Sequence, residues 1–584
     1  MSESFLGVGK SLLGRRWTGP GEEAERIGAA IAQANGLPDI VGRVLARCGA
    51  TPQTAASYLS PSLRELTPDP STLRDMDSAA ERFLRAVDGD ESIAVFADYD
   101  VDGGASAALI LNWLRQLGKT ATLYVPDRIE EGYGPNEAAM RALAGAHSLI
   151  VCVDCGTLSH GPVAAAREAG ADVIVLDHHL GGESLPVAAA LVNPNRQDES
   201  GDLGYLCAAG VVFLFLVALN RLMRGGGRTG PELRDMLDLA ALATVADVAP
   251  LVGFNRALVR QGLKVMAARK RPGLRALADV ARMTSAPNAY HLGFLLGPRV
   301  NAGGRIGAAD LGARLLATAD ENEAAALAER LDALNAERQR IEAEVLAQAM
   351  EQAQTRDISG PLVWAAGEGW HAGVVGIVAG RLKEAFNRPA VVIGLDGEAG
   401  KGSGRSVGGV DLGHAVAACM REGLIEAGGG HRMAAGLSLT RTQVEPAMQR
   451  LGELLGRQGA AAAGPRDLRL DGMIAPGGAT LDLIERLEQA GPFGAGAPAP
   501  RLAVAAARIA FAKPAGETHL RLTLADAGGG RLDAIAFGAF EGPLGPALTS
   551  HRGAPFHFAG RLEIDDWGGR RRPKLRLEDA APVA

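Results

Sequence analysis

The fold is decided by the stretch Ser92-Ile93-Ala94-Val95-Phe96-Ala97-Asp98-Tyr99-Asp100-Val101-Asp102-Gly103. Its first half is a continuous apolar run, which is typical of a strand buried on both faces of a parallel sheet. Its second half carries three aspartates at alternate positions, and a helical pattern follows from Ala105 to Leu117. A strand, an acidic turn and a helix in this order predict an α/β unit whose ligands bind at the carboxyl ends of the strands.

Three more acidic motifs follow within the same region. Further strands are predicted at Ala121–Val125, Leu149–Val153 and Ala171–Leu176, alternating with helices. Asp154 comes directly after the second of these strands, and Asp177-His178-His179 comes after the third. Asp247 follows a helical stretch from Arg234 to Val245. We therefore expect these acidic motifs and histidines to gather at one edge of a parallel sheet.

Taken singly, each of these acids has an ordinary explanation. An aspartate after a strand often caps the next helix. The D-x-D-x-D-G pattern also resembles the start of a calcium loop, but that loop needs a glutamate at its twelfth position, which is Leu109 here. Capping does not explain four such motifs in one unit. Crowded carboxylates raise each other's pKa unless a cation lies between them.

The predicted ligand set favours hard divalent ions. Carboxylate oxygens with an imidazole suit Mn²⁺ or Mg²⁺, whereas structural zinc prefers thiolates. Two such ions about 3.5–4 Å apart lower the pKa of a shared water and clamp a phosphate for in-line attack. The acidic motifs therefore predict a two-metal centre that acts on a phosphate ester.

The rest of the chain predicts three further parts. Asp320 to Arg356 has no glycine or proline and reads as one long helix. A second α/β unit follows, with strands at Leu362–Ala365 and Ala390–Ile393. After a linker at Gln458–Pro465, alternating strands and the turn Gly528-Gly529-Gly530 predict a small barrel of the OB-fold type.

Composition excludes some classes of protein. The chain has 584 residues, is 47% apolar and has a net charge of −7, which argues against a surface coated with basic residues but not against a local nucleic-acid site. No apolar run approaches the ~20 residues that span a bilayer, and Val211–Leu216 reads as part of a core helix. Residues 1–17 show no signal-sequence pattern, and the five cysteines are scattered. We expect a cytoplasmic protein.

Two motifs keep a functional and a structural interpretation. Cys152 and Cys155 form a C-x-x-C pattern, which we interpret as small apolar residues in a buried strand rather than as a redox pair or half a zinc site. Arg570-Arg571-Arg572-Pro573-Lys574, near Trp567, suits single-strand binding by charge neutralisation and stacking. The alternative is a solvated hairpin tip.

In chain order, the acidic motifs resemble those of the DHH phosphoesterase superfamily. Leu296–Arg305, Trp370–Leu382 and Gly428–His431 are similar to the RecJ-type branch of that superfamily and to its DHH-associated domain. The resemblance runs from about residue 76 to the C-terminus. Together with the patterns it implies a lead-in at 1–75, a DHH domain at 76–319, a connecting helix at 320–356, a DHH-associated domain at 357–457 and an OB-like nucleic-acid-binding domain at 458–584.

The resemblance also implies a role for each acidic motif. One metal ion would be held by Asp98 or Asp100 together with Asp154. The other would be held by Asp102, Asp154, His178 and Asp247, so that Asp154 bridges. His179 would either lie near the scissile phosphate or orient a ligand. Many superfamily members have a histidine where this chain has Phe96, and Asp98 is the nearest candidate substitute.

The same resemblance supplies candidates for substrate binding. Ser403 and Arg405 would grip a terminal 5′ phosphate, with Arg128 as a partner. Tyr133 would stack on a base, although a lone tyrosine is as often part of a core. Arg305 and His431 would contact the phosphate backbone near the metals. An active site between two α/β lobes would admit a single strand and exclude a duplex.

The activity implied is metal-dependent 5′-to-3′ exonuclease action on single-stranded DNA, which releases 5′ mononucleotides in DNA repair and recombination. Single-strand-binding protein and a repair helicase are implied as partners. One alternative is a phosphodiesterase of the same superfamily acting on short oligonucleotides or cyclic dinucleotides, whose members are generally shorter. Another is a DNA-binding scaffold with a decayed site, but every acidic and histidine position of the motifs is filled.

Overall fold

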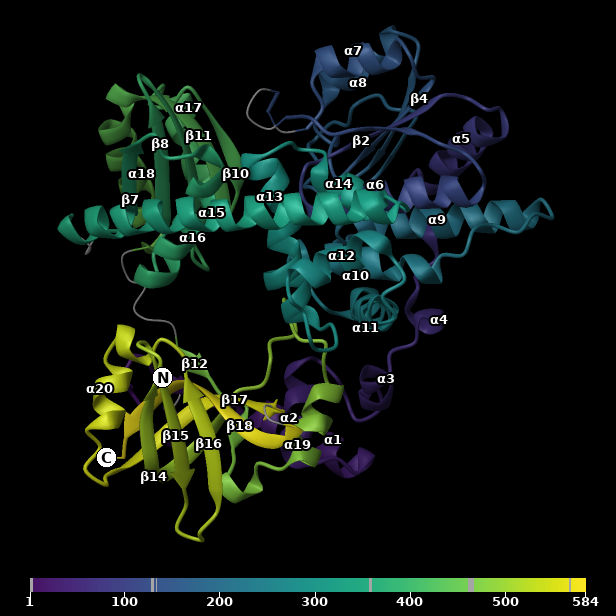
Figure 1. Cartoon of the computed structure of the whole chain (residues 1–584). Helices are drawn as coiled ribbons and strands as arrows, with labels where there is room; N and C mark the ends of the chain where they lie inside the picture. The colour runs from purple at the N-terminus through teal and green to yellow at the C-terminus, as the bar shows by residue number, and fades with distance from the viewer. Residues whose placement is uncertain are drawn as a thin grey trace. The chain divides into compact units, whose positions relative to one another are not determined.

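A computed structural model describes residues 4–127, 131–132, 134–356, 360–460, 467–566 and 569–583. The chain forms two compact units (Figure 1). One comprises Ala56–Ala336 with Gln489–Ala499, and is called here the first unit. The other, the second unit, comprises Met1–Ala55, Glu337–Glu488 and Pro500–Ala584. The division falls inside the long helix α15 (Glu321–Thr355), which was predicted at 320–356.

The first unit is built on a five-stranded sheet in the order β3-β2-β4-β5-β6. All neighbouring pairs are parallel, as the continuous apolar runs predicted. Strands β2 and β4 are buried at every residue. The strands are β2 (Ile93–Ala97), β3 (Thr122–Tyr124), β4 (Leu149–Val153), β5 (Asp172–Leu176) and β6 (Ala190–Val192), of which β6 was not predicted.

The register of this sheet brings three strand ends to one level. Ala97 at the end of β2 pairs with Val153 at the end of β4, and Val153 pairs with Leu176 at the end of β5. The residues that follow these strands therefore leave the sheet side by side. This is the edge at which the sequence predicted the metal ligands.

Helices cover this sheet and extend the unit beyond it. Helix α6 (Val101–Gln116) begins four residues earlier than the predicted Ala105, because the Asp100 side chain caps it. Helix α9 (Ala208–Gly225) contains the predicted core run; it is the one described helix long and apolar enough to cross a membrane, and 67% of it is buried.

The remaining helices of this unit are α3 (Ala55–Leu59), α4 (Leu63–Leu66), α5 (Met76–Asp88), α7 (Glu137–Ala144), α8 (His160–Glu168), α10 (Leu237–Ala246), α11 (Gly253–Ala267), α12 (Pro272–Val280), the π-helical turn η4 (His291–Leu296), α13 (Gly297–Ile306) and α14 (Leu311–Ala317), with short 3₁₀ turns at Pro70–Thr72 and Arg234–Met236.

The second unit contains a mixed sheet in the order β10-β11-β9-β8-β7. Only the pair β7–β8 is parallel. Its strands are β7 (Val363–Glu368), β8 (Ala390–Asp396), β9 (Ala399–Arg405), β10 (Ala427–His431) and β11 (Ala434–Thr440), and its helices are α16 (Ala372–Phe386), α17 (Leu412–Arg421) and α18 (Val444–Arg457). The predicted second α/β unit is therefore present, with more antiparallel pairing than its strand pattern suggested.

The same unit contains a closed barrel. Its strands pair in the order β13-β14-β15-β16-β18-β17, and β14 also pairs with β17, which closes a ring of five strands. The predicted hairpin around Gly528–Gly530 joins β15 to β16. Bounds are β13 (Gly472–Met473), β14 (Leu502–Ala515), β15 (His519–Ala525), β16 (Arg531–Ala536), β17 (Pro555–Asp565) and β18 (Arg572–Pro582), with α19 (Leu481–Gln489), α20 (Leu544–Thr549) and 3₁₀ turns at Pro476–Gly478 and Ala539–Glu541.

The N-terminal segment packs on this barrel. Strand β1 (Trp17–Thr18) pairs in parallel with β12 (Leu468–Arg469). The Trp17 Nε1–H donates to Asp579 Oδ2 at 3.1 Å, and the Ser11 hydroxyl donates to the same oxygen at 2.7 Å. Helices α1 (Glu22–Asn35) and α2 (Asp39–Arg47) and a 3₁₀ turn at Phe5–Gly7 complete the segment. No local sequence pattern predicted this association.

Candidate metal centre

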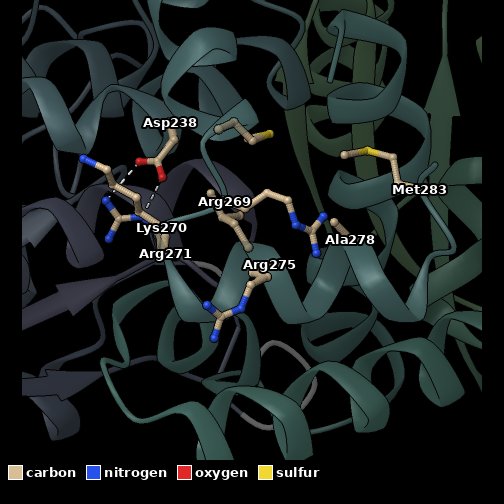
Figure 2. Close-up of a pocket in the computed structure, with 9 residues that line it drawn as sticks. Asp238, Arg269, Lys270, Arg271, Arg275, Ala278 and Met283 are labelled. Atoms are coloured by element: carbon tan, nitrogen blue, oxygen red, sulfur yellow. Dashed lines mark hydrogen bonds and ion pairs between the residues drawn. The ribbon is translucent and has the colours of Figure 1, made fainter. Parts of the chain in front are cut away.

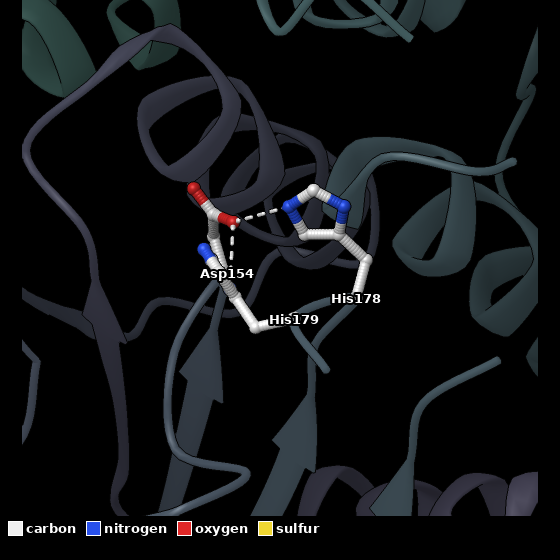
Figure 3. Close-up of side chains that lie close together, drawn as sticks. All are labelled: Asp154, His178 and His179. Carbon is white, nitrogen blue, oxygen red and sulfur yellow. Dashed lines mark ion pairs between the residues drawn. The ribbon is translucent and has the colours of Figure 1, made fainter. Parts of the chain in front are cut away.

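The predicted ligands gather at the level strand ends of the first unit. Asp98 follows β2, Asp154 follows β4, and Asp177 with His178 and His179 follows β5. His178 Nε2 lies 3.3 Å from Asp154 Oδ1, and His179 Nδ1 lies 3.9 Å from the same oxygen (Figure 3). The imidazoles and the carboxylate thus converge from two neighbouring strands.

Three sets of side chains bring ligand atoms within 4.8 Å of one another. His178 links the two histidine-containing sets, because its Nε2 lies 3.7 Å from Asp102 Oδ2 and its Nδ1 lies 3.9 Å from Asp247 Oδ2. The sets are Asp98, Asp100 and Asp154; Asp154, His178 and His179; and Asp102, His178 and Asp247. Every predicted metal ligand belongs to at least one set.

Helix N-termini hold two of the carboxylates in place. Asp100 accepts hydrogen bonds from the backbone N–H groups of Asp102 and Gly103, so it caps α6. Asp102 accepts from the N–H groups of Ala208 and Ala209, at 2.7 and 2.8 Å, at the start of α9. The positive end of a helix stabilises a nearby anion. Asp102 is 1% exposed, so its carboxylate is fixed within the core of the unit.

Two residues at the candidate metal centre have strained backbones. Asp154 adopts φ 60°, in the left-handed region, while its N–H donates to the Leu176 carbonyl. Val248, the residue after Asp247, also has φ 60°. A β-branched residue rarely adopts this conformation, and such strain concentrates at functional sites.

Burial and like charges shift the carboxyl groups toward their protonated forms. Burial raises the pKa of Asp154 well above its usual value, and the carboxylates of Asp102, Asp100, Asp98 and Asp177 raise it further. Burial, with Asp102 and Asp100, raises the pKa of Asp247 to about 8. Burial also raises the pKa of Asp102. Divalent cations would replace these protons, so the donor set fits metal binding.

His179 has a different environment from His178. Its Nδ1 lies 2.8 Å from Asp177 Oδ1. Burial opposes its charged form, but the Asp177 hydrogen bond and charge raise the pKa of His179 to about 9. Although burial raises the pKa of Asp177, the hydrogen bond and charge of His179 and the hydroxyl of Thr157 lower it below its usual value. The contact with Asp177 therefore favours the protonated imidazole of His179.

Residues that sequence reasoning missed support the histidines. Asn193, which follows β6, donates to Thr157 Oγ1 and to the His179 carbonyl. Asn195 donates to the His178 carbonyl at 2.6 Å. Such outer partners orient metal ligands. The only sequence signal was the polar run Asn193-Pro194-Asn195 after an apolar stretch.

Among the substrate-binding candidates, Arg305 lies in the same unit as the acids. It belongs to α13, where Asn301 Oδ1 accepts the N–H of Val101 at 2.9 Å. A Cβ on Gly304 would meet the Tyr99 side chain at 2.5 Å, so α13 packs directly against the acidic turn. The structure therefore places Arg305 on an element that contacts the acidic turn.

The other described candidates lie in the second unit. Arg405 Nη1 donates to Ser403 Oγ at 3.0 Å, and both residues are on β9. A Cβ on Gly376 of α16 would approach the Ser403 hydroxyl and the Arg405 guanidinium to about 3 Å. Ala434 of β11 pairs with both Arg405 and His431, so these two lie at the same end of the two strands that flank β11. Arg128 and Tyr133 lie outside the described residues.

Two sequence motifs receive structural interpretations. Cys152 lies in β4, whereas Cys155 follows that strand rather than lying in it; both are buried and free. Burial, with Asp177, raises the pKa of Cys152 to about 12, so it is an inert thiol. In the basic run, Arg571 pairs with Glu485 and Lys574 with Asp565. Trp567 lies outside the described residues.

Comparisons with known proteins agree with this architecture. Three family profiles match: the DHH family N-terminal domain at residues 92–244, the DHHA1 domain at 359–457 and the RecJ OB domain at 470–579. The single-stranded-DNA-specific exonuclease RecJ of Dickeya dadantii is 38% identical, with 94% of this chain and 96% of that protein covered. RecJ of Escherichia coli is 36% identical, with the same coverage.

A solved structure extends the similarity to three dimensions. RecJ of Thermus thermophilus in complex with Mn²⁺ matches with a TM-score of 0.80 and 28% identity, over 97% of this chain and 79% of that chain. A Mg²⁺ complex of the same protein matches with a TM-score of 0.73, 26% identity, and coverage of 97% and 78%. The acidic motifs occur in the order of the family profile, the barrel matches the RecJ OB domain, and the similarity to RecJ proteins extends over nearly the whole chain. This chain therefore belongs to the RecJ family of single-stranded-DNA-specific exonucleases.

Proposed function

We propose that this chain degrades single-stranded DNA from its 5′ end by two-metal-ion hydrolysis and releases 5′ mononucleotides. The observation that carries the proposal is the convergence of six aspartate and histidine ligands at the level strand ends of the first unit. Membership of the RecJ family supports the substrate. Mn²⁺ and Mg²⁺ are the proposed ions, since relatives are solved with each of them.

The ligand sets support an assignment of each side chain. Asp98, Asp100 and Asp154 would hold one ion. Asp102, His178 and Asp247 would hold the other, with Asp154 near both because its Oδ1 is 3.3 Å from His178. Bound ions would lower the pKa of a water and neutralise the charge of a phosphodiester. Because helix N-termini hold the carboxylates of Asp100 and Asp102, these side chains would keep the two ions in fixed positions relative to each other.

His179 is proposed as the group that contacts the scissile phosphate. Its charged imidazole would stabilise the negative charge that develops on the phosphate oxygens. Asp177 holds the ring by its Nδ1, so Nε2 remains the nitrogen that would face the substrate. The sequence left two roles open for His179, and its hydrogen bond to Asp177, which favours the charged imidazole, supports the phosphate contact.

The second unit would bind the end of the strand. Arg405 and Ser403, which hydrogen-bond to each other on β9, form a compact donor group for a terminal 5′ phosphate. His431 at the same end of the sheet and Arg305 on α13 would contact the backbone. We also propose Arg128 for the phosphate pocket and Tyr133 for base stacking. The predicted domain limits are proposed as well.

The cellular setting is proposed from the family. Degradation of single strands serves DNA repair and recombination. Single-strand-binding protein and a repair helicase are proposed partners, since one would coat the substrate and the other would generate it. The proposed location is the cytoplasm.

The test is Mn²⁺-dependent digestion of single-stranded DNA oligonucleotides labelled at either end. The proposal expects immediate release of the 5′ label as a mononucleotide, with none from a blunt duplex and none with Asp154→Ala. Intact long strands together with cleavage of dinucleotides or cyclic dinucleotides would instead support the small-substrate phosphodiesterase. Release from the 3′ end would refute the polarity.

A further inference from the structure

Two aromatic side chains of the first unit stand exposed and face to face. Tyr290 is 58% exposed and Phe294 is 72% exposed. Their ring centroids lie 5.3 Å apart and their planes differ by 22°, which is a stacked arrangement. Large apolar side chains that gather on a surface commonly mark a binding site.

The backbone that presents this pair is unusual. Phe294 lies in the π-helical turn η4, and Tyr290 immediately precedes it. In this turn Leu292 and Leu296 are buried at 0% and 1% exposure, whereas the alternate residues Tyr290 and Phe294 point outward. π-Helical turns are rare and frequently occur at functional sites. The buried leucines therefore fix the orientation of the two exposed rings.

The turn is anchored at its start by reciprocal hydrogen bonds. The His291 N–H donates to Asn288 Oδ1 at 3.1 Å, and the Asn288 N–H donates to His291 Nδ1 at 3.2 Å. The His291 ring also contacts Tyr290 edge-on, with centroids 6.1 Å apart. The aromatic pair is thus preorganised on a rigid element.

The turn also lies against the element that ends in a metal ligand. A Cβ on Gly293 would be 3.4 Å from Val245 Cγ1, and a Cβ on Gly297 would be 3.4 Å from Ala246 Cβ. Val245 and Ala246 are the last residues of α10, and Asp247 follows directly. Val248, the next residue, is 70% exposed. The π-helical turn and the residue that follows it therefore pack on the end of α10 that leads into Asp247.

We propose that Tyr290 and Phe294 form a stacking platform for bases of the strand whose backbone is bound at the metal centre. This inference rests on the proposed function and deepens it. Base–aromatic stacking is tolerant of sequence, because every base has a π-face. In a duplex each base pair is stacked between neighbouring pairs, so the faces of its bases are covered and the platform favours an unpaired strand.

The chemistry of the pair fits bases better than a second copy of this chain. The two rings are uncharged, so they would add contact area for a base without placing a positive charge near the metal ions. The contact with α10 places the platform beside the proposed phosphate site, where a polymeric substrate must continue. A self-association surface would have no such need for a position next to Asp247.

The experiment compares a base-bearing strand with a strand that has abasic sites near its 5′ end. The disruptive variant is Tyr290→Ser with Phe294→Ser, and the matched control is Tyr290→Phe with Phe294→Trp, which keeps both rings. For wild type and the control, base-bearing DNA should have a KM about tenfold or more below that of abasic DNA. In the disruptive variant, KM for base-bearing DNA should rise to the abasic value.

Turnover of bis(p-nitrophenyl) phosphate with Mn²⁺ reports on the metal centre without bases, and it should be equal in all three proteins. The platform is refuted if the disruptive variant still prefers base-bearing DNA, or if it loses the chromogenic activity together with the preference. A change in its elution volume alone, with the preference kept, would assign the pair to self-association. A wild type that degrades no single strand would instead overturn the proposed function.

Discussion

The two ends of helix α10 place an aspartate in opposite surroundings. Asp238, in its first turn, receives two hydrogen bonds of 2.9 Å from the Arg271 guanidinium (Figure 2). Asp247, just after its last turn, lies among carboxylates that, with burial, raise its pKa to about 8. One acid is neutralised within the protein, and the other requires protons or cations from solution.

The surroundings of the two acids extend this contrast. The pocket around Asp238 is rich in arginine and lysine, yet its cations pair with acids: Arg269 with Asp279, Lys270 with Asp235 and Arg275 with Glu321. At the candidate metal centre, burial and four other carboxylates raise the pKa of Asp154. A charged cluster that is balanced internally serves the fold, whereas a cluster of like charges is suited to a ligand.

A substitution of Asp154 is the most direct test of this difference between the two charged clusters. Asp154→Asn keeps the shape of the side chain but removes a ligand that lies in two of the three sets. We expect hydrolysis of single-stranded DNA to fall by about a thousandfold or more, because a bound ion stabilises the transition state by several kcal/mol. The metal-free protein should be as stable as wild type or more so. Activity within tenfold of wild type would contradict the assignment.

At the other end of α10, Arg271→Ala should affect the fold rather than the chemistry. The pair with Asp238 is buried, with side-chain exposures of 11% and 4%. Removal of one partner leaves an uncompensated buried charge, so the free energy of unfolding should fall by about 3 kcal/mol. Urea titration measures this loss. The double change Asp238→Leu with Arg271→Met should recover much of it, and kcat of the folded enzyme should stay unchanged throughout.

The stability of the metal-free protein should decrease as pH rises. The folded pKa of Asp247 is about 8, against the ordinary aspartate pKa of 3.8. The folded state therefore holds a proton that the unfolded state releases, and stability declines from about pH 4 to about pH 8. Thermal unfolding in EDTA at pH 6 and pH 8 measures the decline. Mn²⁺ should reverse it, and Asp247→Asn should reduce it; a melting temperature that rises with pH in EDTA would contradict this cause.

The smallest effect is expected at the rim of the basic pocket. Arg269 and Asp279 form an ion pair with side-chain exposures of 39% and 63%. Exposed pairs contribute little, so Arg269→Ala should lower the free energy of unfolding by about 0.5 kcal/mol. Binding of single-stranded DNA, followed by fluorescence anisotropy, should be unaffected. A marked loss of DNA affinity would show that the pocket is a nucleic-acid site after all.

Local sequence patterns predicted much of the framework. The buried strands β2, β4 and β5 and helix α15 appeared within a residue or two of their observed bounds. The pattern missed β14, a 14-residue strand whose alanine-rich sequence has weak alternation. It also missed the start of α6, because the cap formed by Asp100 extends the helix into the acidic turn.

The sequence by itself determined which residues gather in the candidate metal centre, because apolar strands place the residues that follow them at one sheet edge. Only the tertiary structure decided how those residues are held and charged. Asp102 is fixed by the start of α9, 106 residues away in sequence, and the His179 carbonyl accepts a hydrogen bond from Asn193, 14 residues away. Such contacts between distant segments depend on packing, which no local pattern records. The exposure of Tyr290 and Phe294, and the pairing of β1 with β12, have the same origin.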